Sequence, residues 1–563
     1  MQNFKKIFFA FTKKERIAFF IAAGLSLASF IVVAGMVTVQ ATTVVPAAGG
    51  DYTEGIVGQP EYVNPVTAAS ETDLGLVKMV YSNIYDIADR VDVSPDGRTW
   101  TVRLKENLHW QDGEKLTSDD VVFTVQSIEN PDAASPLAQS WQGVAVSRGS
   151  ELEVQFSLAN PYAFFADNLR NLYILPKHLF ANTPPGNWHL SDFNLKPVGS
   201  GPYQFVSYEK QSDGTISAYH LQAWDDYFGT KPLIAHFNFQ FSANTGDLIK
   251  KFNAGQIDGM GNLLPGDLAG INRPYDLSTW RTPSYYAVFF NQSKSLPLED
   301  DAVREALSVA ADRNALVVDV LGGKGKPDYG PVPEDAPYFA STASTAPAVT
   351  ASTTSSTAAA PTPTDLASSI LNAAGWKAGA DGFRAKTIQK TSVPLVVNMT
   401  VPQIDFLVKT ADELAAVWQT IGVRVNIATS SPQELLTGSI KNRDYESLLF
   451  GNVLGPSSDL YAFWDSSQRF SPGLNLAIYS NKKVDSLVEA ARMDMNDASR
   501  TAQFASAERT IAADDPAVFL YSPDYLYVTD KGVQGIAPQF LPDPSDRFRA
   551  IGTWYLNTAR VLK

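Results

Sequence analysis

Cysteine is absent from the 563-residue sequence. Without a thiol the chain has no disulfide, no zinc–thiolate or iron–sulfur site, no cysteine nucleophile and no lipid-modified cysteine. This absence does not decide the redox compartment, because a large domain outside the cell can be stable without disulfides. Histidine is also scarce. None of the 5 histidines is spaced four residues from another, which excludes an HExxH zinc motif.

Recognisable enzyme motifs are missing as well. Residues 199–201 (Gly-Ser-Gly) lack the spacing of a nucleophile elbow, and a structural turn explains them better. Residues 322–327 resemble a phosphate loop, but Pro327 stands where such a loop needs Ser or Thr. Acidic residues are plentiful, yet no spacing singles out a catalytic pair. The residues alone therefore leave carboxylate-pair catalysis open, and they show no motif for another catalytic residue, a metal or a cofactor.

The charge distribution excludes one class of partner. The formal net charge is −14, and residues 1–16 hold five basic residues and one acid. This leaves 40 basic and 58 acidic residues in the rest of the chain, a net charge of −18. Such a body repels phosphate backbones, so we expect no binding to nucleic acid.

One apolar run is long enough to cross a membrane. Residues 17–39 contain 23 residues without a charge, and a helix of that length spans a hydrocarbon core of about 30 Å. The basic cluster in front of it predicts residues 1–16 in the cytoplasm and everything after Gln40 outside it. A cleaved signal peptide, processed at residues 39–41, is the competing interpretation, but its apolar region is usually shorter. We therefore expect an uncleaved, single-pass anchor in the cell membrane, with the ectodomain on the periplasmic or extracellular face. No later run can span, which argues against a channel or permease.

Two segments look unstructured. Residues 40–50 predict a short flexible tether. Residues 341–363 contain only Ser, Thr, Ala, Pro and Val and predict a disordered surface loop, with a glycosylated stalk as the alternative.

Residues 392–450 have the most legible pattern. Apolar alternation predicts strands at 393–400, 423–427 and 445–450, and helical periodicity predicts a helix at 406–421. Residues 431–434 (Ser-Pro-Gln-Glu) form a capping box that starts a second helix. This order implies a parallel sheet covered by helices, in which ligands lie beyond the carboxyl ends of the strands. The expected ligand-binding loop is therefore 451–455.

Six stretches are similar to motifs of one known family. Residues 108–123 hold an aromatic residue, Asp-Gly and then Asp-Val-Val-Phe, and residues 199–203 (Gly-Ser-Gly-Pro-Tyr) are close to a Gly-Thr-Gly-Pro-Tyr turn. The others are at 94–104, 290–313, 479–485 and 515–521. Together they resemble, in order and across about residues 51–540, the extracellular solute-binding proteins of family 5. That family is the oligopeptide- and dipeptide-binding class serving ABC importers.

The resemblance implies an α/β fold: a two-lobed clamshell of the periplasmic-binding-protein type II class with an extra subdomain, here preceded by one transmembrane helix. Mapped onto this chain, lobe I would contain residues 51–85, 188–288 and 519–563, the inserted subdomain residues 86–187, and lobe II residues 289–518. The hinge would lie near residues 285–292 and 515–522.

The function implied by the resemblance is capture rather than chemistry, so the protein would not be an enzyme and would have no catalytic residue, metal or cofactor. The ectodomain would be the receptor of an ABC importer, closing its lobes around an oligopeptide or dipeptide and delivering it to a permease. Its partners would be the permease subunits, through them the ATPase subunits, and the membrane; the chain itself would be a monomer. A receptor for an oligosaccharide or another solute, and a sensory ectodomain without transport, are the alternatives.

Site residues also come from the resemblance. The expected ligand contacts are Ser70, Glu71, Tyr285, Tyr286, Asn452, Gly455, Asp459 and Tyr521. For the tyrosines, hinge packing is an equally good interpretation, because their amphipathic rings suit both roles. Glu71 can also be a solvated loop charge, and Ser70 a turn residue.

One departure from the family bears on the ligand. Peptide-binding members place an acidic residue, which pairs with the ligand's amino terminus, a few positions after the strand that corresponds to residues 445–450. Here Leu454 and Gly455 fall at that place, Asn452 replaces a common aromatic, and the nearest acid is Asp459. Either Asp459 takes over from a shifted loop, or the ligand is not a peptide with a free amino group. A helix-capping role for Asp459 is a further alternative.

Overall fold

The computed structural model describes residues 12–562 except 334–335, 337–360, 458 and 538–539. Most of the uncharged Ser/Thr/Ala/Pro tract therefore lies outside the described residues, and its expected disorder stays a prediction. The end of that tract is helical, since α13 (Pro363–Ala373) begins at its last residue. Thr362 caps this helix in a box with Asp365.

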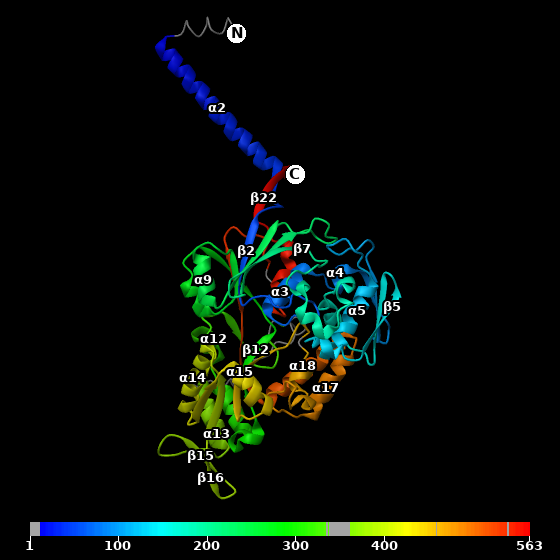
Figure 1. Ribbon diagram of the computed structural model, residues 1–563. Coiled ribbons are helices and arrows are strands. Elements are labelled where there is room, and N and C mark those ends of the chain that lie inside the picture. Colours follow the sequence, from blue (N-terminus) through cyan, green and yellow to red (C-terminus); the bar gives the residue numbers. More distant parts are fainter. Residues whose placement is uncertain (1–11, 334–335, 337–360, 458, 538–539, 563) are drawn as a thin grey trace.

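A single long helix, α2 (Lys13–Ala41), extends away from the rest of the molecule (Figure 1). Its segment Lys13–Val33 has a mean hydropathy of 2.1 and no buried residue. A buried core helix is thereby excluded for this segment. By length and composition it can cross a membrane, as an anchor or as a signal sequence.

The segment after α2 differs from the flexible tether that we expected. Strand β1 (Thr42–Ala47) pairs antiparallel with β22 (Asn557–Leu562) in a two-stranded ribbon. Gly49 donates its backbone N–H to the carbonyl of Leu233 at 2.8 Å, and the carbonyl of Gly50 accepts from Ala235 at 3.1 Å. Both glycines have positive φ, which glycine adopts without strain. The segment is therefore structured and tied to the first lobe.

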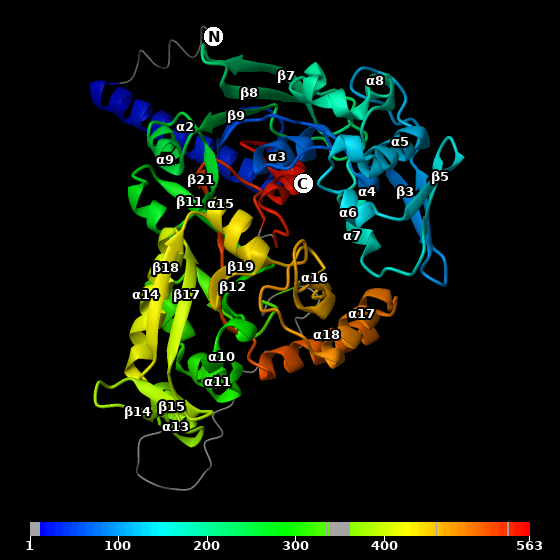
Figure 2. The same ribbon diagram turned by 60° about the horizontal axis from the view of Figure 1, so that its bottom comes forward.

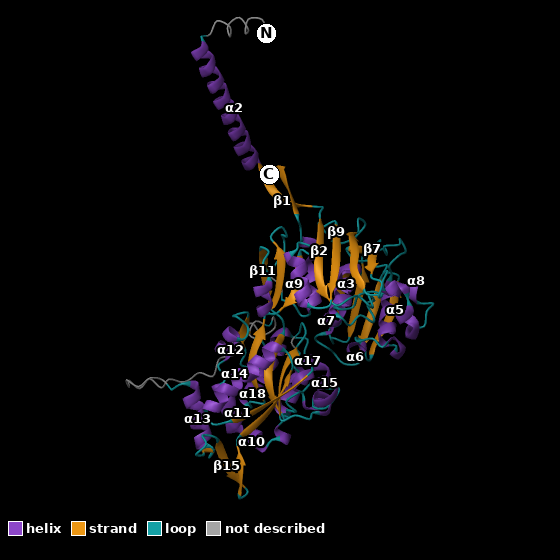
Figure 3. Ribbon diagram, turned by 60° about the vertical axis from the view of Figure 1, so that its left-hand side comes forward, coloured by secondary structure: helices purple, strands orange, loops and turns teal. Residues whose placement is uncertain are grey.

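Lobe I is built on a seven-stranded sheet with the order β11-β21-β10-β2-β9-β8-β7. Strand β2 is parallel to both of its neighbours, β9 and β10. Helices α3 and α9 pack on this sheet (Figure 3), and the 3₁₀ helix η8 packs against α3. The elements are β2 (Asp51–Val57), α3 (Glu71–Val80), β7 (Tyr203–Lys210), β8 (Ile216–Ala223), β9 (His236–Ser242), α9 (Thr245–Asn253), β10 (Gly259–Leu263), β11 (Tyr275–Trp280), β21 (Tyr525–Asp530) and η8 (Pro544–Thr553).

The subdomain has a four-stranded antiparallel sheet with the order β3-β4-β6-β5. A capping box starts its main helix: Thr117 caps α5, and Asp120 accepts from the Thr117 N–H at 2.9 Å. Its elements are α4 (Ile84–Ile87), β3 (Ala88–Val93), β4 (Thr99–Leu104), α5 (Ser118–Glu129), α6 (Ala138–Trp141), β5 (Val144–Ser150), β6 (Glu153–Leu158), α7 (Phe165–Arg170) and α8 (Lys177–Phe180).

Lobe II is built on a six-stranded sheet with the order β13-β20-β12-β19-β17-β18. Its strands are β12 (Ser284–Phe290), β13 (Gly325–Pro327), β17 (Val396–Pro402), β18 (Arg424–Ser430), β19 (Ser447–Val453) and β20 (Ala517–Pro523). Its helices include α10 (Leu296–Glu299), α11 (Asp301–Ala310), α12 (Arg313–Asp319), α14 (Asp405–Thr420), α15 (Pro432–Leu435), α16 (Tyr461–Trp464), α17 (Lys482–Met493) and α18 (Asp497–Ala513). A small sheet of β14 (Lys377–Ala378), β15 (Arg384–Ile388) and β16 (Thr391–Pro394) extends from it.

The predicted parallel sheet is confirmed only for part of lobe II. Strand β17 is parallel to β18 and β19, but β12 pairs antiparallel with β19 and β20. The sheet is mixed because β12 arrives from lobe I, which the pattern of residues 392–450 does not reveal. Strand β19 also runs to Val453, so Gly451 and Asn452 lie within the strand and not in the loop that we expected.

Two short connections join the lobes. Residues 281–283 lead from β11 to β12, and Asp524 alone separates β20 from β21. An ion pair between Arg281 and Asp524 joins the two connections. The hinge thus lies outside the expected stretches 285–292 and 515–522, which are mainly strand in the lobe II sheet.

Candidate functional site

The two main sheets meet at these connections, so residues near them on both sheets lie close to the hinge. On lobe II, Tyr286 is opposite Tyr521 in the sheet, and the Leu454 N–H donates to the carbonyl of Pro283 at 2.8 Å. On lobe I, Leu263 is opposite Leu526, two residues after Asp524. The hinge-facing strand ends of lobe II hold four of the eight predicted site residues: Tyr285, Tyr286, Asn452 and Tyr521.

Tyr285 and Asn452 form one buried pair. The Asn452 Nδ2 donates to the Tyr285 hydroxyl at 2.9 Å, across the β12–β19 ladder. Both side chains are buried, and burial raises the pKa of the Tyr285 hydroxyl. The pair therefore belongs to the interior of lobe II, where it fixes the register and side-chain positions of the two strands.

Tyr286 and Tyr521 form a second pair, on the other face of β12. Their ring centroids are 5.9 Å apart, and Phe406 meets the Tyr286 ring edge-on at 5.2 Å. Tyr521 is fully buried, and its hydroxyl shares a 2.6 Å hydrogen bond with Thr410. Tyr286 is only half-buried, so it is the tyrosine of this pair that presents surface. A Cβ on Gly451 would come within 2.8 Å of the Tyr286 ring, so this close packing needs glycine.

Ser70 and Glu71 lie on lobe I at the start of α3. Ser70 is the N-cap: its hydroxyl accepts from the Asp73 N–H at 3.0 Å and donates to the Asp73 carboxylate at 2.8 Å. Glu71 accepts from Arg547 at 2.7 Å and from Asn262 at 3.4 Å. Ser70 is thus confirmed as a turn and cap residue in local structure, and Glu71 is held in place by two donors.

A buried charge network beneath Glu71 was missed by sequence reasoning. Arg547 Nε lies 3.1 Å from Glu54 Oε1, and the two side chains are 1% and 0% exposed. The hydroxyls of Tyr52 and Tyr527 donate to the other oxygen of Glu54, at 2.9 and 2.7 Å. Burial raises the pKa of Glu54, and the Arg547 guanidinium opposes that rise. Nothing in the sequence pairs Glu54 with an arginine 493 positions away.

The charges in this network do not balance. One guanidinium, that of Arg547, is shared by two carboxylates, Glu54 and Glu71. With both acids ionised the group carries one negative charge in excess. The more exposed carboxylate is that of Glu71, with 28% of its side chain accessible. A cationic ligand group is therefore attracted to Glu71.

Asp459 is in a different situation. Arg492 Nε lies 3.0 Å from Asp459 Oδ2, and Asp459 Oδ1 accepts from the Tyr461 N–H at 3.0 Å. Burial raises the pKa of Asp459, against the effect of Arg492. The pair is balanced one to one, and the carboxylate is also used near the start of α16. Gly455, earlier in the same loop, has a φ of +73° and open space where a Cβ would point.

A cavity of about 1320 Å³ opens elsewhere in lobe II. It is bordered by α11, the end of α18 and residues 477–480, and none of the predicted site residues lines it. Asp515, at its edge, has its pKa raised to about 6 by burial. Within the described residues, no cluster of three or more His, Asp or Glu side chains is placed to hold a metal ion.

Comparison with known proteins decides the family. The model of the bacterial extracellular solute-binding proteins, family 5, matches residues 84–471. The chain belongs to this family. Among its relatives, protein XP55 of Streptomyces lividans is 29% identical over 509 residues, covering 86% of both chains. The oligopeptide-binding protein AppA of Bacillus subtilis is 26% identical, covering 87% of this chain and 89% of AppA.

Solved structures of solute-binding proteins share the fold of this family 5 member. The ABC transporter substrate-binding protein CtaP of Listeria monocytogenes superposes with a TM-score of 0.74 at 24% identity, over 90% of this chain and 99% of CtaP. AppA of Bacillus subtilis in complex with a nonapeptide gives 0.67 at 24% identity, over 91% and 100%. The predicted α/β clamshell of two lobes is confirmed, together with an N-terminal apolar helix.

Proposed function

We propose that this family 5 protein is an extracytoplasmic receptor that captures oligopeptides or dipeptides by closing its lobes and delivers them to an ABC permease. Family membership supports binding rather than catalysis, because the relatives are binding proteins. AppA of Bacillus subtilis is named as an oligopeptide-binding protein and was solved with a nonapeptide. Binding through the peptide backbone suits such ligands, since strand edges can form hydrogen bonds with an extended peptide whatever its side chains.

The charge imbalance around Arg547 carries the assignment of the site. Glu71 would receive the amino group of the peptide, with Ser70 holding the turn that presents it. Tyr286 and Gly455 would contact the peptide from lobe II. Tyr285, Asn452 and Tyr521 would act by positioning these surfaces. Asp459 is the competing acid, and it would first have to leave Arg492.

The location is part of the proposal. Residues 17–39 would remain as the membrane anchor, with residues 1–16 in the cytoplasm and the two lobes outside it. The permease subunits would be reached at the membrane, and the ATPase subunits through them, by a monomeric receptor. Residues 17–39 of α2 carry no charge, and the segment Lys13–Val33 is not buried, which supports this arrangement.

The full chain, purified in detergent, tests the function. Mass spectrometry of co-purified small molecules should find peptides. A peptide present at 100 times its dissociation constant should add about 2.7 kcal/mol to the unfolding free energy, seen as a higher melting temperature. Stabilisation by a glycan pool but by no peptide pool would replace peptide with sugar as the cargo. Turnover of either pool would contradict a pure receptor.

A further inference from the structure

The end of helix α2 is joined without a gap to the β1–β22 ribbon. The helix ends at Ala41 and β1 begins at Thr42, which is paired with Leu562 of β22. Arg560 Nε donates to the Thr42 hydroxyl at 3.0 Å. In Figure 1, β22 lies directly below the lower end of α2 and above lobe I. Strand β22 is thereby brought back to the outer end of the apolar helix.

One face of the ribbon combines aliphatic side chains with a cation. Residues directly opposite each other in an antiparallel pair share a face, as do alternate residues along a strand. Thr42, Val44, Arg560 and Leu562 therefore lie on one face. Leu562 is 80% exposed and Val44 is 52% exposed. Aliphatic groups beside an arginine suit the interface of a bilayer, where the apolar groups enter the lipid and the guanidinium meets the headgroups.

The ribbon has a fixed base and a defined length. Its lobe end is held by the backbone hydrogen bonds of Gly49 and Gly50, and by the bridge between Gln534 and Tyr555. Its six residue pairs extend about 20 Å at roughly 3.3 Å per residue. Thr42 and Leu562 are thus at the helix end, and Arg560 is about 7 Å further out. This distance of about 7 Å is similar to the thickness of the headgroup layer on one side of a bilayer.

We propose that the helix-proximal half of the β1–β22 ribbon lies in the outer interface of the membrane. Leu562 and Val44 contact the lipid, and Arg560 meets the phosphate groups. The ribbon then works as a strut that keeps lobe I on the membrane side and lobe II away from it. This inference rests on the proposed anchor, because a chain cut after α2 would not be held at the bilayer.

The absence of cysteine makes the test clean, because one introduced thiol is a unique label. Full-length Leu562→Cys, labelled with a polarity-sensitive dye, is reconstituted in vesicles of phosphatidylcholine and phosphatidylglycerol. We expect a blue-shifted emission that is quenched by lipids spin-labelled at the headgroup. Thr558→Cys is the matched control: it lies on the same face, about 13 Å further out, and should be quenched by iodide in the water instead. Equal lipid quenching at the two sites, or iodide quenching at both, would overturn the inference.

Two further measurements separate its failure from failure of the anchor. The mass of the reconstituted protein, and its flotation with the vesicles, report whether residues 1–40 are retained. A retained, floating protein with a water-exposed Leu562 label contradicts the strut alone, whereas loss of residues 1–40 contradicts the anchor and the strut together. Oxidation of Thr43→Cys/Val561→Cys should form a disulfide, because these residues are directly opposite in the ribbon. Failure to form it would contradict the ribbon itself.

Discussion

Phe164 of the subdomain stacks on Phe504 of lobe II, with ring centroids 5.8 Å apart and ring planes at 28°. Phe164 is buried among residues of the lobe II core, and the Arg500 guanidinium lies 5.4 Å from the centre of its ring. The subdomain lies in the chain between α3 and β7 of lobe I, and Figure 2 shows it facing α17 and α18. This contact is therefore a second link between lobe II and the rest of the molecule, in addition to the hinge.

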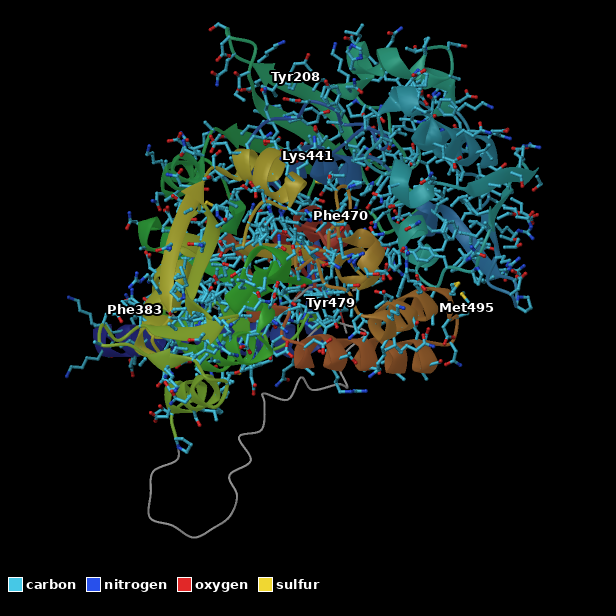
Figure 4. All side chains as sticks on the ribbon, turned by 90° about the horizontal axis from the view of Figure 1, so that it is seen from below. Tyr208, Phe383, Lys441, Phe470, Tyr479 and Met495 are labelled. Carbon is cyan, nitrogen blue, oxygen red and sulfur yellow. The ribbon has the colours of Figure 1, made fainter. Side chains whose placement is uncertain are left out.

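Backbone and side chains extend this link. The Ala163 N–H donates to the carbonyl of Arg492 at 2.7 Å, and the Arg492 guanidinium lies 5.1 Å from the ring centre of Tyr162. A Cβ on Gly97 would come within 2.7 Å of Met495, which lies at the edge of lobe II in Figure 4. Opening the lobes about the hinge must break these contacts, so they favour the closed arrangement.

Replacing Phe164 should shift the equilibrium between the closed and open arrangements of the lobes. In Phe164→Ala, lobe II loses the buried aromatic contact, and we expect the unliganded protein to populate a more open form. Small-angle scattering should show a larger radius of gyration than for the wild type. Ligand affinity should fall, because the ligand must then supply more of the closure free energy.

The matched control is Phe470→Ala in lobe II (labelled in Figure 4), since the Phe470 side chain is 65% exposed. It should change neither measurement. An unchanged radius of gyration in Phe164→Ala would show that this contact does not hold the lobes together.

Removing Arg492 should leave the carboxylate of Asp459 without its counter-charge. In Arg492→Ala the carboxylate of Asp459 loses its cation, so its pKa, already raised by burial, rises further. We expect a loss of about 1–3 kcal/mol in unfolding free energy at pH 7, because both partners are only partly buried. Since the folded pKa then exceeds the unfolded one, the folded state gains a proton as the pH falls, and the loss shrinks toward pH 4.

Chemical denaturation at the two pH values measures this effect. The double variant Arg492→Ala/Asp459→Asn should recover part of the loss at pH 7 and show little dependence on pH. The same loss at both pH values in Arg492→Ala would mean that packing on Tyr162 and Tyr461, and not the charge, accounts for it.

Asp515 predicts a pH dependence of its own. Burial raises its pKa to about 6, so the folded state holds a proton that the unfolded state releases near pH 4. Its contribution to stability falls as the pH rises from about 4 to about 6, by at most about 3 kcal/mol. Asp515→Asn removes this titration and keeps a residue that tolerates the observed φ of +43°.

Thermal unfolding checks this prediction. We compare the melting temperature of Asp515→Asn with that of the wild type at each pH. This difference should favour the variant more at pH 7 than at pH 4. Asp444→Asn, whose side chain is 76% exposed, is the control and should show no such change. A pH-independent difference between Asp515→Asn and the wild type would mean that Asp515 does not titrate in this range.

Local elements could be predicted from the sequence because each rests on neighbouring residues. Helix α14 (Asp405–Thr420) covers nearly all of the predicted helix 406–421, and the predicted capping box of residues 431–434 forms at α15. The exact hinge residues could not be predicted from the sequence, because they depend on which of the two main sheets includes β12 and β20. That choice is made by the antiparallel pairing of Tyr286 with Tyr521, 235 positions apart in the chain.

The candidate site likewise combines residues that local sequence predicts with residues whose positions depend on distant parts of the chain. The N-cap at Ser70 follows from its local spacing to Asp73. The position of Glu71 depends on Arg547, which reaches it from η8 near the other end of the chain. Asp459 illustrates the opposite case: its sequence position suggested a ligand contact, and only the fold shows Arg492 beside it. Long-range charge pairing therefore separates the acids that their local sequence leaves equivalent.

Replacing either Glu71 or Asp459 by its amide tests which of the two carboxylates binds the amino terminus of the ligand. Glu71→Gln keeps the hydrogen-bonding shape of the side chain and removes the excess negative charge of the Arg547 network. We expect about tenfold weaker binding of a peptide with a free amino terminus, the loss of roughly 1.4 kcal/mol from a partly exposed charge pair. Binding of the same peptide with an acetylated amino terminus should not change, which shows that the site is still intact. Asp459→Asn should leave the free-amino peptide's affinity near the wild-type value. Titration calorimetry measures all four combinations, and weaker binding in Asp459→Asn but not in Glu71→Gln would assign the amino group to Asp459 instead.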